Sequence, residues 1–299
     1  MITLPLPEIV VDGLSLPECP RWHDGALYFS DITAGRVHRL NADDSTELLY
    51  ESSTDFIGGL GFLNNGDLLA AASKQRQVLR IVDGKAEVFA DLSGLCPYVL
   101  NDMIVIDNNA YVGQPGYDPW GAHMDKMPDP ADVLFANTEG SVSVAASDLM
   151  SPNGIAVSPD GSTLYVAEST GNRISCFTRD SATGALSNRR VFATLPDGGI
   201  PDGICLDDEG AVWAAMPIAV TPNAYLSGLG VVRLVEGGQV THVVPVGEGR
   251  RALACAFGGP DRKSLYICTV PEFHGSAAAS EGHGRLERIS LDFIGAGRP

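Results

Sequence analysis

Long apolar runs and a surplus of basic residues are both missing from this sequence. No stretch reaches the run of about eighteen apolar residues that a membrane-spanning helix needs. The first residues, MITLPLPEIVVDG, contain no basic segment followed by a long apolar one, so no secretory leader is expected. The formal net charge of -17 leaves no basic face for nucleic acid and would repel an anionic membrane. We therefore expect a cytoplasmic protein that binds neither nucleic acid nor membrane.

Three common signatures of chemistry are absent as well. The six cysteines are widely separated and form no Cys-x-x-Cys pair, which excludes a zinc ribbon or a thioredoxin-like site and favours reduced thiols in the core. No Gly-x-Ser-x-Gly occurs, so a serine nucleophile elbow has no support. No glycine-rich loop follows a strand and opens a helix, so a nucleotide cofactor is not expected.

The sequence does contain a repeat built from strands and tight turns. Six turns recur at intervals of roughly forty to fifty residues, at His23-Asp24-Gly25, Asn64-Asn65-Gly66, Asp107-Asn108-Asn109, Pro159-Asp160-Gly161, Asp208-Glu209-Gly210 and Gly259-Pro260-Asp261. Each turn is followed by a similar strand: ALYFSD, DLLAAA, NAYVGQ, TLYVAE, AVWAAM or SLYICT. These strands alternate apolar and small or polar residues, and no segment shows sustained helical periodicity.

This repeat predicts one all-β domain over residues 1–299, a six-bladed β-propeller with four-stranded blades. We expect the N-terminal strand EIVVDG to pair with the C-terminal strand GRLERISLD, so that the two ends of the chain close one blade. A two-sheet β-sandwich is the alternative, but a sandwich rarely contains six evenly spaced hairpins.

Three longer segments interrupt the repeat: Tyr117–Ala131, Pro217–Gly228 and Phe273–Gly284. Loops of this length within a compact fold often act as lids or substrate contacts, although they can also be plain surface decoration. The sequence leaves their role open.

Oxygen-bearing side chains occur in the turn before the first strand of four blades. They are Glu18, Asn101, Asn153 and Asp202. The same end of every innermost propeller strand faces the centre of the ring, so we expect these side chains to converge. Carboxylate and amide oxygens without Cys or His suit a hard divalent cation. Each residue alone could simply be a turn former, but their matched positions favour a site.

The chain resembles the senescence marker protein/gluconolactonase family, also called regucalcin-like proteins, over nearly its full length. The matching residues are Pro17-Glu18-Cys19-Pro20-Arg21-Trp22, Leu27-Tyr28-Phe29-Ser30-Asp31, Asn101-Asp102, Ser151-Pro152-Asn153-Gly154, Asp160-Gly161 with Leu164-Tyr165-Val166-Ala167-Glu168, Pro201-Asp202-Gly203-Ile204, and Gly258-Gly259-Pro260-Asp261. The resemblance implies a six-bladed propeller, a divalent metal at its centre, and hydrolysis of a sugar lactone or a related ester.

By position, Glu18, Asn153 and Asp202 resemble the metal ligands of that family. Asn101 resembles its substrate-contacting Asn and is close enough to join the ligands. We expect one divalent ion, with calcium first, while magnesium, manganese, zinc and iron are not distinguished. Asp202 is our choice of general base, with a hydroxide formed at the ion as the alternative.

The chain also departs from the family at its expected substrate contacts. Val99 stands where members that act on sugar lactones commonly have Arg, and the segment Tyr117–Ala131 has no clear counterpart of a sugar-binding Glu. Together with Tyr117 and Trp120, Val99 supports a less polar lactone or ester at least as well as a sugar lactone, and the sequence leaves both open. Tyr98, Leu100 and Met124 are expected nearby.

The sequence thus predicts a metal-dependent lactonase that acts on a small-molecule lactone or ester. The alternatives are a non-catalytic calcium- or ligand-binding propeller and a propeller scaffold for protein partners. A monomer and a small homo-oligomer are equally consistent with the sequence.

Overall fold

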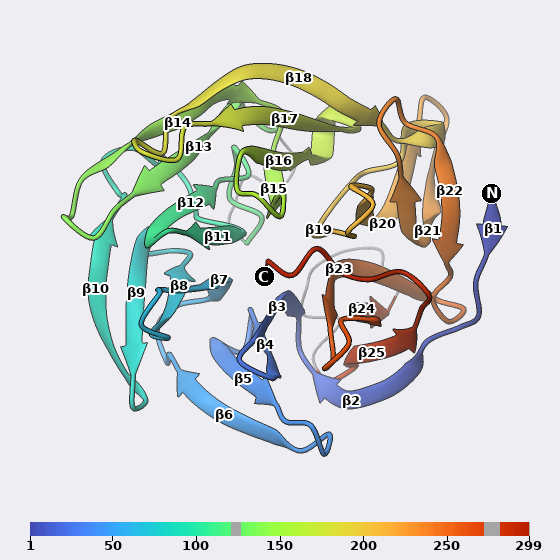
Figure 1. The fold of residues 1–299 in the computed structure, drawn as a ribbon, viewed down its shortest axis with the longest axis horizontal. Coiled ribbons are helices and arrows are strands. Elements are labelled where there is room, and N and C mark those ends of the chain that lie inside the picture. The colour runs from blue at the N-terminus through green and yellow to red at the C-terminus, as the bar shows by residue number, and fades with distance from the viewer. Residues whose placement is uncertain (121–126, 272–281, 299) are drawn as a thin grey trace.

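A computed structural model describes residues 1–120, 127–271 and 282–298, and it shows six antiparallel sheets arranged around a common axis (Figure 1). The predicted six-bladed β-propeller is therefore confirmed. In the described part of the chain, the helices are two single-turn 3-10 segments, η1 (Ser169–Gly171) and η2 (Pro196–Gly198). None of the described helices is long and apolar enough to cross a membrane.

The first three blades each contain four strands in sequence order, the first strand innermost (Figure 1). The first blade consists of β3 (Pro17–His23), β4 (Ala26–Asp31), β5 (Arg36–Leu40) and β6 (Thr46–Glu51). The second consists of β7 (Ile57–Phe62), β8 (Leu68–Ala72), β9 (Gln77–Val82) and β10 (Lys85–Asp91). The third consists of β11 (Met103–Ile106), β12 (Asn109–Gly113), β13 (Ala131–Ala136) and β14 (Val142–Leu149).

The other three blades complete the ring. The fourth consists of β15 (Pro152–Val157), β16 (Thr163–Glu168), β17 (Arg173–Arg179) and β18 (Leu186–Thr194). The fifth consists of β19 (Ile204–Leu206), β20 (Val212–Thr221), β21 (Ala224–Leu234) and β22 (Val240–Val244), with β1 (Ile2–Thr3) as a short parallel addition to β22. The sixth consists of β23 (Arg250–Gly258), β24 (Ser264–Pro271), β25 (Gly284–Ser290) and β2 (Glu8–Leu14).

The ends of the chain close the sixth blade, as predicted. β2 pairs antiparallel with β25, with Glu8 opposite Arg288 and Leu14 opposite Gly284. Because the outermost strand comes from the N-terminus and the other three from the C-terminus, the ring is sealed by backbone hydrogen bonds.

Tight turns set the register of the inner hairpins. Between β3 and β4, Asp24 and Gly25 both have positive φ, 45° and 77°, as a two-residue turn that matches strand twist requires. All six turns identified in the sequence connect the first and second strands of a blade.

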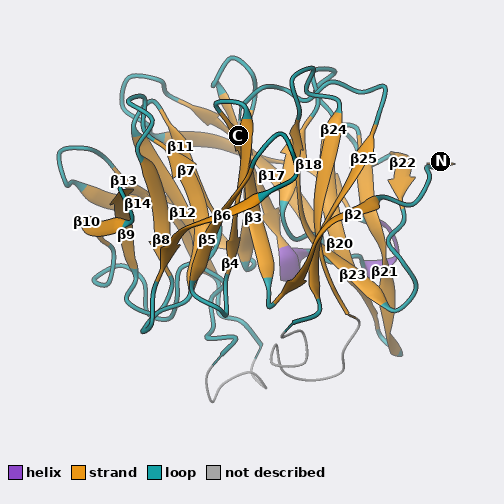
Figure 2. Ribbon diagram, turned by 90° about the horizontal axis from the view of Figure 1, so that it is seen from below, coloured by secondary structure: helices purple, strands orange, loops and turns teal. Residues whose placement is uncertain are grey.

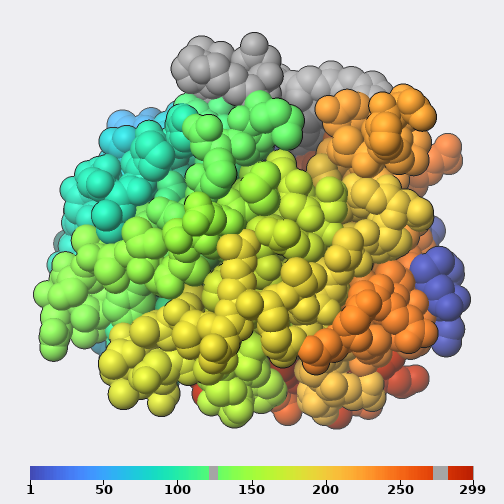
Figure 3. Space-filling model, turned by 90° about the horizontal axis from the view of Figure 1, so that it is seen from above, coloured from blue at the N-terminus to red at the C-terminus, as the bar shows by residue number. Residues whose placement is uncertain are grey.

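The hydrophobic core lies between neighbouring blades. One cluster joins Ile174 and Phe192 of the fourth blade to Ile204 and Val232 of the fifth, and another joins the fifth blade to the sixth around Trp213. Figure 3 shows the fourth blade, in yellow-green, filling the space between the green third blade and the orange fifth blade. Sheets packed face to face in this way hold the inner strands in fixed positions (Figure 2).

Two details of the sequence analysis are wrong. The segment Pro217–Gly228 is not an inserted loop, because β20 and β21 continue through it and pair from Ile218 opposite Ser227 to Thr221 opposite Ala224. Alternating residues such as Ile218 and Val220 let the hairpin extend beyond the blade. The predicted turns at Glu18 and at Asn153 do not precede their strands either, since each residue lies at the start of an inner strand, β3 or β15, at a β-bulge.

Candidate metal centre and substrate cavity

The starts of the inner strands surround a cavity of about 380 Å³. Glu18 lies on β3 and Asn153 on β15, while Asn101 and Asp202 each lie two residues before a strand, β11 and β19. All four side chains line this cavity, together with Val99, Tyr117 and Trp120. The structure thus brings every residue of the predicted site to one cavity, whereas the roles assigned to them stay predictions.

A β-bulge positions Glu18. The register of β3 and β4 shifts between Glu18 and Arg21, and Cys19 between them has a φ of 51°, which is rare for a residue with a side chain. The backbone N–H of Cys19 donates to Glu18 Oε2 at 2.9 Å. This strained backbone holds the carboxylate at the cavity wall instead of in the strand's regular alternation.

Gly154 allows the backbones next to Asn153 and Asp202 to come close. Its N–H donates to the Asp202 carbonyl at 3.2 Å. A Cβ placed on Gly154 would lie 2.5 Å from that carbonyl oxygen and 2.6 Å from the Ile204 nitrogen. Only glycine fits between these two blades, which explains why glycine follows the cavity-lining Asn153.

Backbone hydrogen bonds fix Asn101 as well. Its N–H donates to the Gly113 carbonyl at 2.9 Å, and its own carbonyl accepts from Gly59 N–H at 3.0 Å. The residue is therefore held between the second and third blades before β11 begins.

A buried ion pair lies next to this ring of oxygens. Arg21 Nη2 on β3 contacts Asp102 Oδ1 at 2.7 Å, and both side chains are about one-twentieth exposed. Asp102 also accepts hydrogen bonds from Met103 N–H at 2.8 Å and from Ile155 N–H at 3.2 Å. One carboxylate thus links the first, third and fourth blades beside the site.

No basic side chain is among the described residues that line the cavity with the Glu18 and Asp202 carboxylates. Burial, together with the nearby Asp202 carboxylate, raises the pKa of Glu18 well above its usual range. Burial and the Asp102 carboxylate raise the pKa of Asp202 to about 7, although the Asn153 amide opposes this rise. A divalent cation would offset the unfavourable charge on the buried Glu18 and the part-buried Asp202.

The predicted ligands fit a hard cation by their chemistry. Two carboxylates and two amide side chains offer oxygen atoms only, which suits calcium, magnesium or manganese. Within the described ranges, no three or more His, Cys, Asp and Glu side chains are grouped so as to hold a metal ion. An ion at this site would therefore depend on the amides of Asn101 and Asn153 and on water.

The rest of the cavity wall is largely apolar. Val99 is buried, and Trp120 packs edge to face on Phe56 with ring centroids 5.2 Å apart. Burial raises the pKa of the Tyr117 phenol, consistent with a place inside the cavity. Val99, Tyr117 and Trp120 therefore line the cavity together with Asn101, the fourth predicted substrate-binding residue.

Sequence reasoning missed several apolar wall residues: Leu16, Ile32, Ile200, Ile218 and Leu253. Ile218 lines the cavity because the β20–β21 hairpin continues through residues 218–227. The other four residues belong to no recognisable sequence motif. Tyr98, expected near the site, instead donates to Asp129 at 2.7 Å. Met124 and residues 273–281 of the segment Phe273–Gly284 lie outside the described residues.

Comparison with known proteins gives one family. The family described as SMP-30/Gluconolactonase/LRE-like region matches residues 16–271. A pentonolactonase of Haloferax volcanii is 29% identical over 98% of this chain and 96% of its own length. A regucalcin of Danio rerio is 34% identical over 88% of this chain and 85% of its own.

The fold matches solved structures too. A gluconolactonase structure from Xanthomonas campestris superposes with a TM-score of 0.72 at 26% identity, covering 95% of this chain and 88% of that one. Sequence and fold therefore give the same relationship over nearly the whole chain.

Proposed function

This chain belongs to the SMP-30/gluconolactonase/LRE-like family, and from that membership and its central cavity we propose that it is a divalent-metal-dependent lactonase. The observation that carries the proposal is the convergence of Glu18, Asn153 and Asp202, with Asn101, on one cavity. The lactonase names of two similar proteins, from Haloferax volcanii and Xanthomonas campestris, support the same reaction.

In this proposal Glu18, Asn153 and Asp202 hold the ion, and Asn101 joins them or contacts the substrate. When bound, a divalent ion supplies positive charge that polarises a carbonyl and stabilises negative charge on its oxygen. The proposed ligands come from separate blades, so the rigid ring holds them in place without further adjustment on binding.

The chain's own residues provide the remaining steps. Asp202 acts as the general base, accepting the proton of the water whose oxygen bonds to the lactone carbonyl carbon. It then returns that proton to the ring oxygen as the ester C–O bond breaks. The Asn101 amide donates a hydrogen bond to the lactone and orients it. The apolar wall around Val99 and Trp120 excludes bulk water from the reacting bond, which strengthens each polar contact there.

The cavity wall favours a less polar lactone or ester over a sugar lactone. Sugar hydroxyls need polar partners, and buried polar groups without partners cost binding energy. Val99 and Ile218 offer none and Trp120 offers only its indole N–H, whereas an alkyl or aryl ring gains from contact with all three. The hydroxyl groups in the lining are those of Ser73, Ser151, Ser169, Thr170 and Tyr117.

A panel of lactones with one matched pair of variants tests this proposal. Wild-type protein is assayed by a pH indicator against gluconolactone, aliphatic lactones and aromatic lactones. Asp202→Asn is expected to lose at least about a hundredfold in kcat/KM on the best substrate. Asp208→Asn, an exposed carboxylate near the same strand, is expected to keep full activity. Full activity of Asp202→Asn would overturn the proposed mechanism.

A non-catalytic ion-binding propeller is the second candidate, because the same oxygen donors could hold an ion without any reaction. This function predicts that one ion binds tightly, that Glu18→Gln releases it, and that no lactone of the panel is hydrolysed. Turnover that depends on the ion would exclude it.

A further inference from the structure

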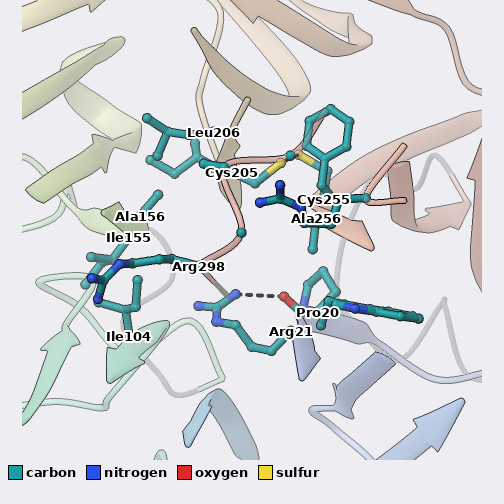
Figure 4. Close-up of a pocket in the computed structure, with 17 residues that line it drawn as sticks. Pro20, Arg21, Ile104, Ile155, Ala156, Cys205, Leu206, Cys255, Ala256 and Arg298 are labelled. Atoms are coloured by element: carbon teal, nitrogen blue, oxygen red, sulfur yellow. Dashed lines mark hydrogen bonds between the residues drawn. The ribbon is translucent and has the colours of Figure 1, made fainter. Parts of the chain in front are cut away.

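A second cavity lies further along the same inner strands. It is lined by residues that follow the first cavity's residues in the chain, such as Trp22 on β3, Ile155 on β15 and Cys205 on β19. Its volume is about 70 Å³, and Figure 4 shows its lining side chains around the C-terminal segment. The two cavities therefore occupy different levels of the propeller axis, and the proposed catalytic residues do not line this one.

Three arginines line this small cavity, although the protein as a whole is strongly acidic. Arg21 comes from β3, Arg262 from the turn between β23 and β24, and Arg298 from the C-terminal segment. Figure 4 shows Arg21 beneath that segment and Arg298 extending toward Ile104 and Ile155. Three segments far apart in the sequence thus each contribute an arginine to the lining of one cavity.

Backbone hydrogen bonds hold the C-terminal segment at this end of the axis. Ala296 N–H donates to the Leu206 carbonyl at 3.0 Å, and Gly295 N–H donates to the Arg262 carbonyl at 2.8 Å. Figure 1 shows this end of the chain at the centre of the ring. Arg298 is therefore placed by the fold, and its Nε donates to the Pro159 carbonyl at 2.9 Å.

The positive charge at this cavity is only partly balanced. Arg21 pairs with Asp102, yet its Nε is buried and has no hydrogen-bond partner among the described residues. Arg262 and Arg298 form no ion pair with any carboxylate in the described ranges. A Cβ placed on Gly161 would lie within 3.6 Å of both Arg298 and Arg179, so a further guanidinium, paired with Asp107, is nearby.

Arg262 and Arg298 are exposed whereas Arg21 is buried, and an anion bound between them would offset the repulsion among their like charges. We propose that this second cavity binds a small oxyanion, a phosphate or a short carboxylate, through Arg262, Arg298 and the free Nε of Arg21. The planar guanidinium group matches the oxygens of both anions. The neighbouring Ile104, Ile155 and Phe257 limit the ligand to a small one.

Isothermal titration calorimetry with inorganic phosphate, at constant ionic strength against chloride, tests the site. Wild-type protein is expected to bind phosphate saturably, one ion per chain. Arg262→Gln and Arg298→Gln are each expected to weaken binding about tenfold, and the double variant more. Arg36→Gln, which alters an exposed arginine on β5, should bind as wild type does.

A parallel titration with glycolate separates the two sources of the anion. If only phosphate binds, the ligand of the site is an inorganic ion, and if only glycolate binds, the ligand is a carboxylate. In both cases the arginine variants should lose the same affinity. Phosphate bound at a metal ion in the first cavity would leave both arginine variants unaffected. Equal binding by wild type and the double variant, or no binding of either anion, would overturn the proposal. These titrations measure anion binding and do not depend on whether the protein hydrolyses a lactone.

Discussion

Glu168 shows how a single buried residue stabilises a blade through its hydrogen bonds and ion pairs. Its side chain is fully buried between β16 and β17, where it contacts Arg173 at 2.8 Å and Arg189 at 2.9 Å. Burial alone would raise its pKa, but hydrogen bonds from Arg173, Ser175, Met150 N–H and Arg189 together lower it to about 2. The ionised carboxylate is thus a fixed part of the fourth blade.

This pKa predicts acid-dependent stability. Because the folded pKa is below the unfolded value, Glu168 stabilises the protein fully above about pH 4.5, and the contribution is lost as pH falls toward about 2. A shift of this size corresponds to about 3 kcal/mol. Urea unfolding from pH 6 to pH 2 should show the gap between wild type and Glu168→Gln closing over that window. Glu47→Gln, an exposed control on β6, should show no such gap, and a constant gap for Glu168→Gln would contradict the account.

Gly154 gives a second prediction at the residue scale. A Cβ there would collide with the backbone at Asp202 and Ile204, so Gly154→Ala should push β15 away from β19. We expect a loss of about 1–3 kcal/mol in stability and a larger loss of lactonase activity, since Asn153 and Asp202 separate. Gly94→Ala is the matched control, because nothing lies within 4 Å of a Cβ there. Wild-type kcat/KM in Gly154→Ala would show that this close approach does not position the site.

At the scale of strands and hairpins, the sequence was informative wherever local chemistry decides the structure. The turn at Pro159-Asp160-Gly161 and the alternation in TLYVAE predict β15 and β16 because both signals are local. The bulges at Glu18 and Asn153 were not predicted, since a bulge depends on the neighbouring strand. The extension of β20 and β21 was missed because Pro217 and Gly228 indicate a loop when read alone.

The candidate site likewise contains residues that the sequence could predict and residues that depend on packing between blades. Glu18, Asn101, Asn153 and Asp202 could be predicted, because repeating blades place equivalent positions around one axis. Wall residues such as Ile32 and Leu253 could not, because their place in the cavity depends on packing between blades, which no short pattern encodes.

At the scale of the whole molecule, we expect closure of the ring by β2 to stabilise the fold. Truncation of the N-terminus tests this. Removal of residues 1–14 deletes β2 and its contacts from Val10, Val11 and Leu14 to the core of the sixth blade. We expect a loss of about 3 kcal/mol or more in urea unfolding. Removal of residues 1–3 deletes only exposed residues of β1 and should cost less than about 0.5 kcal/mol. Equal stability of the two truncated proteins would contradict closure by β2.

The central claim for the whole molecule is that one divalent ion in the first cavity makes the propeller a lactonase. The most direct measurement follows the hydrolysis rate of the best lactone while a single divalent ion is titrated into chelator-treated protein. The account predicts negligible activity without the ion and a rise that saturates at one bound ion per chain. The same titration of Glu18→Gln should show neither binding nor activity at those concentrations. Full activity of ion-free protein would contradict the claim.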